Sequence, residues 1–233
     1  MTNEVAAVVG VGPGLGAALV KRFVKEGFTT IAVARRASSL TSLRGGDEPV
    51  ILYDCDAAVP EQVERLFQKI QADYGPLCIT VFNAGAFERR EVVETDPADF
   101  ERCWRIGCFA GFLVGRAAAR VMLKQGHGTI LFTGATASLR GSAGFVNLAA
   151  PKFALRALAQ SMARELSPHG IHVAHVIIDG QIRSERYQHL LAERGDDSLI
   201  EPDAIADAYL ALHRQQRSAW TLELDLRPWV EKF

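Results

Sequence analysis

The segment Gly10-Val11-Gly12-Pro13-Gly14-Leu15-Gly16 is the most informative part of this 233-residue sequence. It follows Val5–Val9, a β-branched run typical of a buried strand, and leads into Leu15–Glu26, where apolar residues recur at helical spacing. A turn without side chains lets backbone N–H groups and the N-terminus of the following helix approach a phosphate group. Glycines also serve tight packing, but their place between a strand and a helix favours a dinucleotide-binding turn.

Short apolar runs alternate with helical patterns along the rest of the chain. The runs that predict further strands are Thr29–Ala34, Val50–Tyr53, Cys78–Phe82, Thr129–Thr133, His172–Ile178 and Trp220–Asp225. The helical patterns are one with the apolar face Val63, Leu66, Phe67 and Ile70, and the stretches Pro97–Lys124, Lys152–Leu166 and Pro202–His213. Asp96 and Pro97 suit the N-cap and the first position of the longest helix.

Continuous apolar strands separated by helices imply a parallel sheet that is covered on both faces. We therefore predict an α/β fold, a doubly wound Rossmann-type parallel sheet with helices on both faces. The length suits a single domain over residues 1–233, in which residues 200–233 form a C-terminal helix and strand. The polar, weakly patterned segment Gly180–Ser198 is either a mobile substrate loop over the site or a solvated face.

Composition and charge exclude several classes of protein. Lys and Arg number 26 against 27 Asp and Glu, which argues against a general nucleic-acid binder. No apolar run approaches the ~18–20 residues that span a bilayer, and the N-terminus lacks the basic region of a signal peptide, so we expect a cytoplasmic protein without a membrane partner. The four cysteines form no CxxC pair and lie inside apolar segments, which predicts reduced core thiols rather than a disulfide framework or a metal site.

Three motifs together resemble those of the short-chain dehydrogenase/reductase family. The glycines at 10, 14 and 16 have the spacing of its signature turn, and Asn83-Ala84-Gly85 after the fourth strand matches its Asn-Ala-Gly motif. Asp179-Gly180 follows the sixth strand, where the family usually has Pro-Gly. The resemblance extends from the start of the chain to about residue 185. The end, Trp220–Phe233, departs from the family's glycine-ending C-terminus, which leaves its role open.

The resemblance implies a dinucleotide cofactor. It implies cofactor contacts from Gly10, Gly12, Pro13, Gly14, Leu15, Gly16, Asn83, Ala84, Gly85, Asp179, Gly180 and Ile182. It also implies that Asp56 contacts the adenine amino group and that Ala57 adds a backbone contact. Asp56 is equally suited to cap a helix.

The choice of dinucleotide depends on the end of the second strand. An Asp or Glu there would accept a hydrogen bond from the ribose 2′-OH of NAD, whereas arginine suits the 2′-phosphate of NADP by charge and fork geometry. No acid lies at this strand end, and Arg35 and Arg36 follow it directly. We therefore favour NADP(H) over NAD(H), with a pair of solvated basic residues as the alternative.

Most of the family's catalytic groups are missing from the positions where the resemblance places them. By resemblance, a working member uses a tyrosine as general acid/base, a lysine four residues later, a serine and an asparagine. Lys152 fits the lysine, which leaves Leu148 at the tyrosine position, Ala135 at the serine position and Gly107 at the asparagine position. Leucine has no proton to donate. Lys152 itself either binds the nicotinamide ribose or is a solvated lysine at a helix N-terminus.

Other groups near these positions are candidate substitutes. Thr136 and Ser138 lie beside the missing serine, although alternation along an extended segment would turn Thr136 away from the substrate. Tyr187 lies in the segment Gly180–Ser198 and would have to swing in. Pro151 removes a backbone donor and disfavours helical geometry at the preceding residue, which predicts that the helix carrying Lys152 begins late.

Two functions are consistent with this sequence. The first is an NADP(H)-dependent oxidoreductase that acts on an unnamed small molecule with an atypical proton donor. The second is a cofactor-binding but catalytically silent relative that acts as a sensor, a scaffold or a partner subunit. By resemblance we also expect a homodimer or homotetramer, formed through Pro97–Lys124 and Lys152–Leu166, whose many small residues permit close helix packing.

Overall fold

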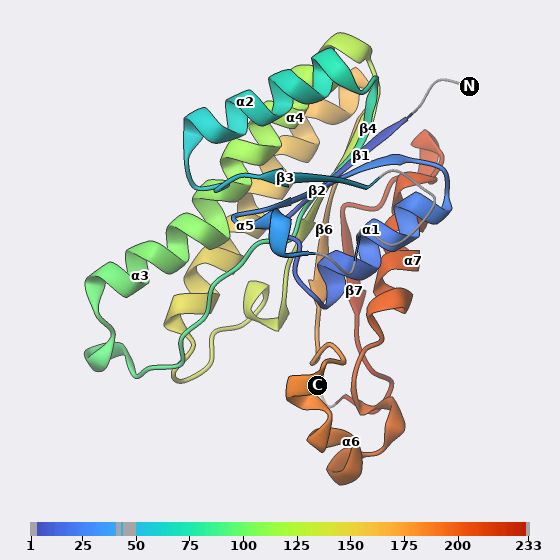
Figure 1. Cartoon of the computed structure of the whole chain (residues 1–233). Coiled ribbons are helices and arrows are strands. Elements are labelled where there is room, and N and C mark those ends of the chain that lie inside the picture. The colour runs from blue at the N-terminus through green and yellow to red at the C-terminus, as the bar shows by residue number, and fades with distance from the viewer. Residues whose placement is uncertain (1–3, 41–42, 44–49, 232–233) are drawn as a thin grey trace.

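A computed structural model describes residues 4–40, 43 and 50–231 of the chain. Its centre is a seven-stranded parallel sheet with the strand order β3-β2-β1-β4-β5-β6-β7 (Figure 1). The strands are β1 (Val5–Val9), β2 (Thr29–Ala34), β3 (Val50–Asp54), β4 (Leu77–Phe82), β5 (Gly128–Thr133), β6 (Ile171–Ile178) and β7 (Glu223–Leu226). The predicted doubly wound α/β sheet is therefore confirmed.

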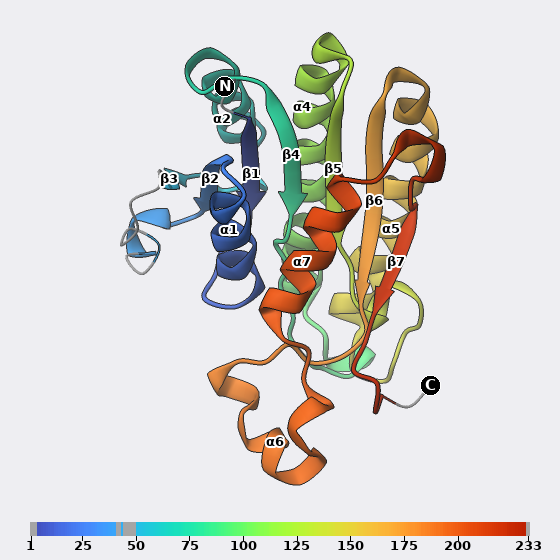
Figure 2. The ribbon, with the colours of Figure 1, turned by 90° about the vertical axis from the view of Figure 1, so that its right-hand side faces the viewer.

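Helices cover both faces of this sheet, as Figure 2 shows. They are α1 (Leu15–Lys25), α2 (Pro60–Asp73), α3 (Pro97–Trp104), α4 (Ala110–Gln125), α5 (Val146–Leu166), α6 (His189–Arg194) and α7 (Pro202–His213). Helices α1 and α7 pack on one face, and α2, α4 and α5 pack on the other. Alternation along β1 serves both layers, because Ala6 and Val8 belong to the core under α1 and α7 whereas Val5, Ala7 and Val9 belong to the opposite core.

The helix predicted over Pro97–Lys124 is continuous but contains a π-helical turn. The Asp96 carboxylate caps its start, as predicted, by accepting a hydrogen bond of 2.7 Å from the N–H of Ala98. The π-helical turn Arg105–Phe109 joins α3 to α4. By length and composition Pro97–Gln125 is apolar enough to cross a membrane, which differs from our expectation. However, 61% of its most apolar window is buried within the fold, so it is a core helix.

Helix α5 begins earlier than expected. A start near Lys152 is wrong, because the helix runs from Val146 and contains Pro151 in its second turn. The N–H groups of Leu148 and Ala149 donate to the Phe145 carbonyl at 3.0 and 2.8 Å, so the first turn closes before the proline is reached. Pro151 is buried, and tertiary packing of these turns therefore outweighs the local cost of the proline.

All four cysteines are buried, as their apolar surroundings predict. Burial raises the pKa of the Cys55 and Cys78 thiols to about 11, which keeps both protonated at neutral pH. Over residues 4–40, 43 and 50–231, no group of three or more His, Cys, Asp or Glu side chains is arranged to hold a metal ion.

Candidate active site

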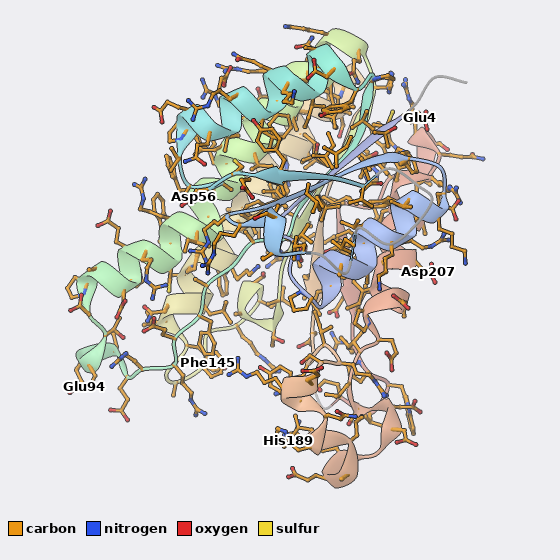
Figure 3. All side chains as sticks on the ribbon, viewed as in Figure 1. Glu4, Asp56, Glu94, Phe145, His189 and Asp207 are labelled. Carbon is orange, nitrogen blue, oxygen red and sulfur yellow. The ribbon has the colours of Figure 1, made fainter. Side chains whose placement is uncertain are left out.

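A cavity of about 780 Å³ opens at the carboxyl ends of β1, β2, β3 and β4. The two strands beside β1 are β2 and β4, so the direction of winding reverses here, and open α/β sheets bind ligands at such a point. The cavity contains ten of the residues expected to contact a cofactor: Gly10, Gly12, Pro13, Arg35, Arg36, Asp56, Ala57, Asn83, Ala84 and Gly85. Figure 3 labels Asp56, which follows β3 and precedes α2.

The glycines of the turn after β1 have two different roles. Gly10 has φ +92°, and a Cβ atom there would lie 2.4 Å from the backbone nitrogen of Ala84. A Cβ atom at Gly16 would lie 2.8 Å from the Cα atom of Val11. In contrast, Cβ atoms at Gly12 and Gly14 would have no described atom within 4 Å. The first pair permits close packing of the turn, and the second pair leaves open space above it.

The open space lies at the start of α1. Gly14 is the N-cap residue of α1 and provides no side-chain cap, which leaves the first N–H groups of the helix without a side-chain partner from that residue. Gly14, Leu15 and Gly16 do not line the cavity, and Leu15 and Gly16 are buried in the packing of α1 on the sheet. Leu15 and Gly16 therefore support the turn through this packing.

The Asn-Ala-Gly motif joins two strand ends. The backbone N–H of Asn83 donates to the Val9 carbonyl at 2.8 Å, and its side-chain amide donates to the Gly10 carbonyl at 3.1 Å. Ala84 packs directly on Gly10. These contacts fix the end of β4 against the glycine turn, and they leave Gly85 exposed on the wall of the cavity.

Arg35, Arg36 and Ser39 line the end of the cavity beyond β2. Both arginines are exposed, and among the described residues neither guanidinium lies within ion-pair distance of a carboxylate. No acid follows β2 in the sequence, as expected. However, Asp54 at the end of β3 lies opposite Ala34 in the sheet, so pairing of β2 with β3 brings an acid from the neighbouring strand next to this strand end.

Asp56 is half-buried in the cavity wall. Its carboxylate accepts a hydrogen bond of 2.9 Å from the N–H of Ala58, while its own N–H donates to the Gln62 side chain at 2.8 Å. The N-cap residue of α2 is Val59. Asp56 therefore stabilises the turn before α2 rather than capping the helix itself, which corrects the alternative interpretation.

Lys152 is buried, so the interpretation as a solvated lysine is wrong. Its ammonium group donates a hydrogen bond of 2.6 Å to the main-chain oxygen of Thr133 at the end of β5. A Cβ atom at Gly85 would lie 4.0 Å from its Nζ atom, so the ammonium group lies close to the wall of the cavity. Burial lowers the pKa of Lys152 to about 8 because the charged form loses hydration.

The positions expected to carry the other catalytic groups lie on three different segments. Leu148 is half-buried in the first turn of α5, and Ala135 is extended at the start of a 3₁₀ turn over Thr136–Ser138. Gly107 is buried in the π-helical turn, where a Cβ atom would lie 3.0 Å from the Cβ atom of Pro151. None of these three side chains can donate a proton.

Two of the three hydroxyl groups considered as substitutes already have hydrogen-bond partners. The Thr136 hydroxyl donates to the Asp179 carboxylate at 2.5 Å. The Ser138 hydroxyl accepts from the N–H of Ala135 at 3.2 Å and lies 3.3 Å from Nε2 of His175, which is fully buried. Tyr187 does not line the cavity, and its ring lies beneath the guanidinium of Arg186 at 5.4 Å.

Asp179, Gly180 and Ile182 lie outside the cavity. The C-terminal residues 227–229, here called the strap, contact Asp179 and Gly180. Arg227 forms an ion pair with Asp179 at 3.3 Å, and a Cβ atom at Gly180 would lie 2.7 Å from Pro228. The indole of Trp229 donates to the Asp197 carboxylate at 3.1 Å. The strap thus holds both ends of the segment 180–198, a role that the sequence left open; residues 232 and 233 lie outside the described part.

Comparisons with known proteins agree with this arrangement. The family model described as short chain dehydrogenase matches residues 4–194. Short chain aldehyde dehydrogenase 1 of Euphorbia lathyris is 30% identical over 178 residues, which cover 74% of this chain but only 62% of that relative's length. The crystal structure of a short-chain dehydrogenase from Rhodopseudomonas palustris is 40% identical with a TM-score of 0.85, and the match covers 98% of this chain and 100% of that one. A metagenomic short-chain oxidoreductase in complex with NADP has the same fold, with a TM-score of 0.84 at 24% identity over 98% of both chains.

Proposed function

The chain belongs to the short-chain dehydrogenase/reductase family of oxidoreductases, and from this premise we propose that it binds NADP(H) in the cavity at the ends of β1 to β4. The observation that carries the proposal is the pairing of an open glycine turn with two arginines on the rim of one cavity, neither of which has a carboxylate partner among the described residues. A volume of about 780 Å³ is within the ~300–1,000 Å³ typical of ligand pockets.

The residues present fit such a cofactor. Backbone N–H groups around Gly12 and the start of α1 would hold the pyrophosphate, and Arg35 and Arg36 would hold the 2′-phosphate. By family resemblance, Asp56 would contact the adenine and Lys152 the nicotinamide ribose. When bound, the nicotinamide supplies hydride chemistry. The relative solved with NADP supports this proposal at the level of fold.

We propose that the substrate is a small molecule with a carbonyl or hydroxyl group, because these are the groups between which a nicotinamide transfers hydride. Hydride transfer to a carbonyl also needs a proton donor close by. The candidate donors are few. Leu148 has no titratable group, and the hydroxyl groups of Thr136 and Ser138 are engaged in hydrogen bonds. Lys152 carries a proton, but its ammonium group is buried and already donates a hydrogen bond to the Thr133 carbonyl.

This shortage of proton donors favours a second candidate function. In it the chain binds NADP(H) without efficient turnover and acts as a sensor, a scaffold or a partner subunit. Leu148, Ala135 and Gly107 would then mark a degenerate catalytic tetrad. The contact between Gly107 and Pro151 supports this candidate, because a Cβ atom at position 107 would lie 3.0 Å from the Cβ atom of Pro151 and an asparagine would fit only if the proline shifted.

We also propose that copies of this chain associate through α4 and α5, as the family commonly does. Aromatic rings form a ladder along α3 and α4, with Trp104 stacked on Phe109 at 5.9 Å and Phe109 on Phe112 at 6.4 Å. Trp104, Phe112 and Phe153 on α5 are each more than a third exposed. A homodimer or homotetramer in the cytoplasm, without a nucleic-acid or membrane partner, fits these features. Sedimentation of Phe112→Glu, which should dissociate the assembly, tests this.

Calorimetric titration of the purified protein with NADPH and, in parallel, NADH tests the cofactor proposal. We expect NADPH to bind at least about tenfold more tightly, a difference of about 1.4 kcal/mol. Equal binding of both, or binding of neither, contradicts it. NADPH oxidation with a broad panel of carbonyl compounds then separates the two candidate functions, because turnover at the no-enzyme background excludes the first.

A further inference from the structure

The turn after β2 is held by a carboxylate from the neighbouring strand. Parallel pairing places Asp54, the last residue of β3, opposite Ala34, the last residue of β2. From there the Asp54 side chain accepts a hydrogen bond of 2.6 Å from the N–H of Ala37 and a longer one, of 3.4 Å, from the N–H of Ser38. Two backbone donors of this turn thus have a single anionic acceptor.

Further bonds tighten the same turn. The backbone N–H and the hydroxyl of Ser39 both donate to the Arg36 carbonyl, at 3.2 and 2.7 Å. The N–H of Leu40 donates to the Ala37 carbonyl at 2.9 Å, and the Ala37 side chain is fully buried. Arg35 and Arg36 therefore lie between the end of a core strand and a closed turn, so their backbone has little freedom.

The Asp54 carboxylate acts on the backbone and not on the arginine side chains. It lies outside the residues that line the cavity, and its oxygens are beyond ion-pair distance from both guanidinium groups. The positive charge of Arg35 and Arg36 is consequently available at the cavity rim, while the negative charge of Asp54 is directed at the N–H groups of the turn.

We propose that Asp54 is a specificity-determining positioning residue, which fixes the turn after β2 so that Arg35 and Arg36 are presented to a phosphate on the adenosine ribose. This inference rests on the proposed NADP(H) site. Ordering two arginine side chains and their backbone on binding costs conformational entropy, and a turn that is already fixed lowers that cost. Asp54 would therefore favour a ligand that carries a 2′-phosphate and contribute nothing to one that lacks it.

Two nucleotide fragments that differ only in this phosphate test the inference. Adenosine 2′,5′-bisphosphate and adenosine 5′-monophosphate are titrated calorimetrically into wild type, Asp54→Ala, Asp54→Asn and the control Asp73→Ala. Asp73 is a half-exposed carboxylate at the end of α2, far along the chain from the turn. We expect Asp54→Ala to weaken binding of the bisphosphate by about tenfold, or about 1.4 kcal/mol. Binding of the monophosphate should stay within about twofold, and Asp73→Ala should change neither.

Asp54→Asn separates positioning from charge. Asparagine keeps one acceptor oxygen for Ala37, so we expect a loss of affinity for the bisphosphate smaller than that of Asp54→Ala. Tighter binding of the bisphosphate by Asp54→Asn would show instead that the carboxylate repels the phosphate, and would overturn the inference. Because this variant changes no volume, it also serves if Asp54→Ala fails to fold.

The remaining outcomes distinguish the inference from the function on which it rests. If wild type prefers the bisphosphate and Asp54→Ala keeps that preference, the inference alone is overturned. Equal weakening of both fragments in Asp54→Ala overturns it as well, since the residue would then be purely structural. If wild type shows no preference for the bisphosphate, the NADP(H) proposal fails first and the inference falls with it. Faster hydrogen exchange at the Ala37 amide in Asp54→Ala would support the positioning role independently of any ligand.

Discussion

The ammonium nitrogen of Lys152 lies 2.6 Å from the main-chain oxygen of Thr133, to which it donates a hydrogen bond inside the protein. The lysine side chain is buried, and burial lowers its pKa to about 8. Charged lysine is thus held where hydration is poor, beside the wall of the cofactor cavity. This arrangement destabilises the folded protein without cofactor and keeps a cation ready for an anionic or hydroxyl-bearing ligand.

Replacing Lys152 by Met should stabilise the protein near pH 7, and the gain should shrink at higher pH. The pKa of about 8 in the folded protein lies below the ordinary lysine value of 10.5 in the unfolded chain, so the cost of the buried charge is complete below pH 8. Between these values the unfolded chain binds the extra proton, and wild-type stability rises with pH. The cost is on the order of 3 kcal/mol before the lost hydrogen bond is subtracted. Urea unfolding of both proteins at pH 7 to 10 measures the difference, and a difference independent of pH contradicts the burial argument.

Replacing two glycines of the turn after β1 by alanine should have different effects on the stability of the protein. Gly10→Ala places a Cβ atom against the Ala84 backbone at positive φ, so we expect a loss of about 2 kcal/mol or more in the free energy of unfolding. Gly12→Ala meets no described atom within 4 Å and should keep stability within about 0.5 kcal/mol. Its methyl group enters the open space of the cavity and should weaken NADPH binding. Thermal unfolding and calorimetry check both, and a fully stable Gly10→Ala would show that the turn can rearrange.

Removing the rim arginines should abolish the preference between cofactors. In the double variant that carries Arg35→Ala and Arg36→Ala, we expect NADPH affinity to fall by at least about tenfold, since a hydrogen bond to a charged group contributes about 1.5–3 kcal/mol. NADH affinity should change little. The matched control is Arg120→Ala, because Arg120 is an exposed arginine on α4 that forms an ion pair with Glu64. An equal loss for both dinucleotides would mean that the arginines support the fold and do not read the 2′-phosphate.

Restoring the missing catalytic groups should require a fourth substitution. Leu148→Tyr, Ala135→Ser and Gly107→Asn supply the family's side chains, but the Cβ atom added at position 107 would lie 3.0 Å from the Cβ atom of Pro151. We expect this triple variant to lose about 1–3 kcal/mol of stability through overpacking, and the addition of Pro151→Ala to recover it. Only the quadruple variant should oxidise NADPH with a carbonyl substrate, at least about 100-fold above Leu148→Tyr alone. A quadruple variant that is folded, binds cofactor and stays inert would refute the idea that these four positions limit turnover.

The strap over 227–229 should control the segment 180–198. Arg227→Ala removes the ion pair with Asp179, and Trp229→Ala removes the hydrogen bond to Asp197. In the double variant we expect faster amide hydrogen exchange in 180–198 and unchanged exchange in α1. The control is Arg214→Ala, because Arg214 forms an ion pair with Glu26, the C-cap residue of α1, and not with the segment 180–198. Unchanged protection of 180–198 would show that this segment is stable without the strap.

Most strands were predictable because each is a compact apolar run. The last strand is alternating instead, and it begins at Glu223 rather than at the predicted Trp220. The observed β4 and β6 begin one residue before Cys78 and His172, and the Asp96 cap lies where the residue types placed it. These features depend on residues that are neighbours in sequence. The start of α5 was missed because it depends on residues that are distant in sequence. The rule for residues before proline is local, whereas the first turns of α5 are stabilised by packing against other elements.

The parts of the site that were missed all come from elements distant in sequence. Asp54 reaches the turn after β2 only because β3 pairs with β2 in one register. For Lys152 the family resemblance supplied the position, but a solvated side chain stayed open as an alternative, because nothing in its sequence neighbourhood shows that it reaches the end of β5. The engagement of Thr136 by Asp179 likewise follows from the adjacency of β5 and β6. The glycine turn, in contrast, is continuous in sequence, so its place between β1 and α1 could be predicted from neighbouring residues alone.

The contact between Gly107 and Pro151 couples two positions that are far apart in sequence. A Cβ atom at position 107 would lie 3.0 Å from the Cβ atom of Pro151, so the side chains that fit at the two positions depend on each other. The effect of a substitution at position 107 is therefore not a property of that position alone. For anyone who rebuilds this site, the order of the changes matters: replacing the proline first avoids an overpacked intermediate variant.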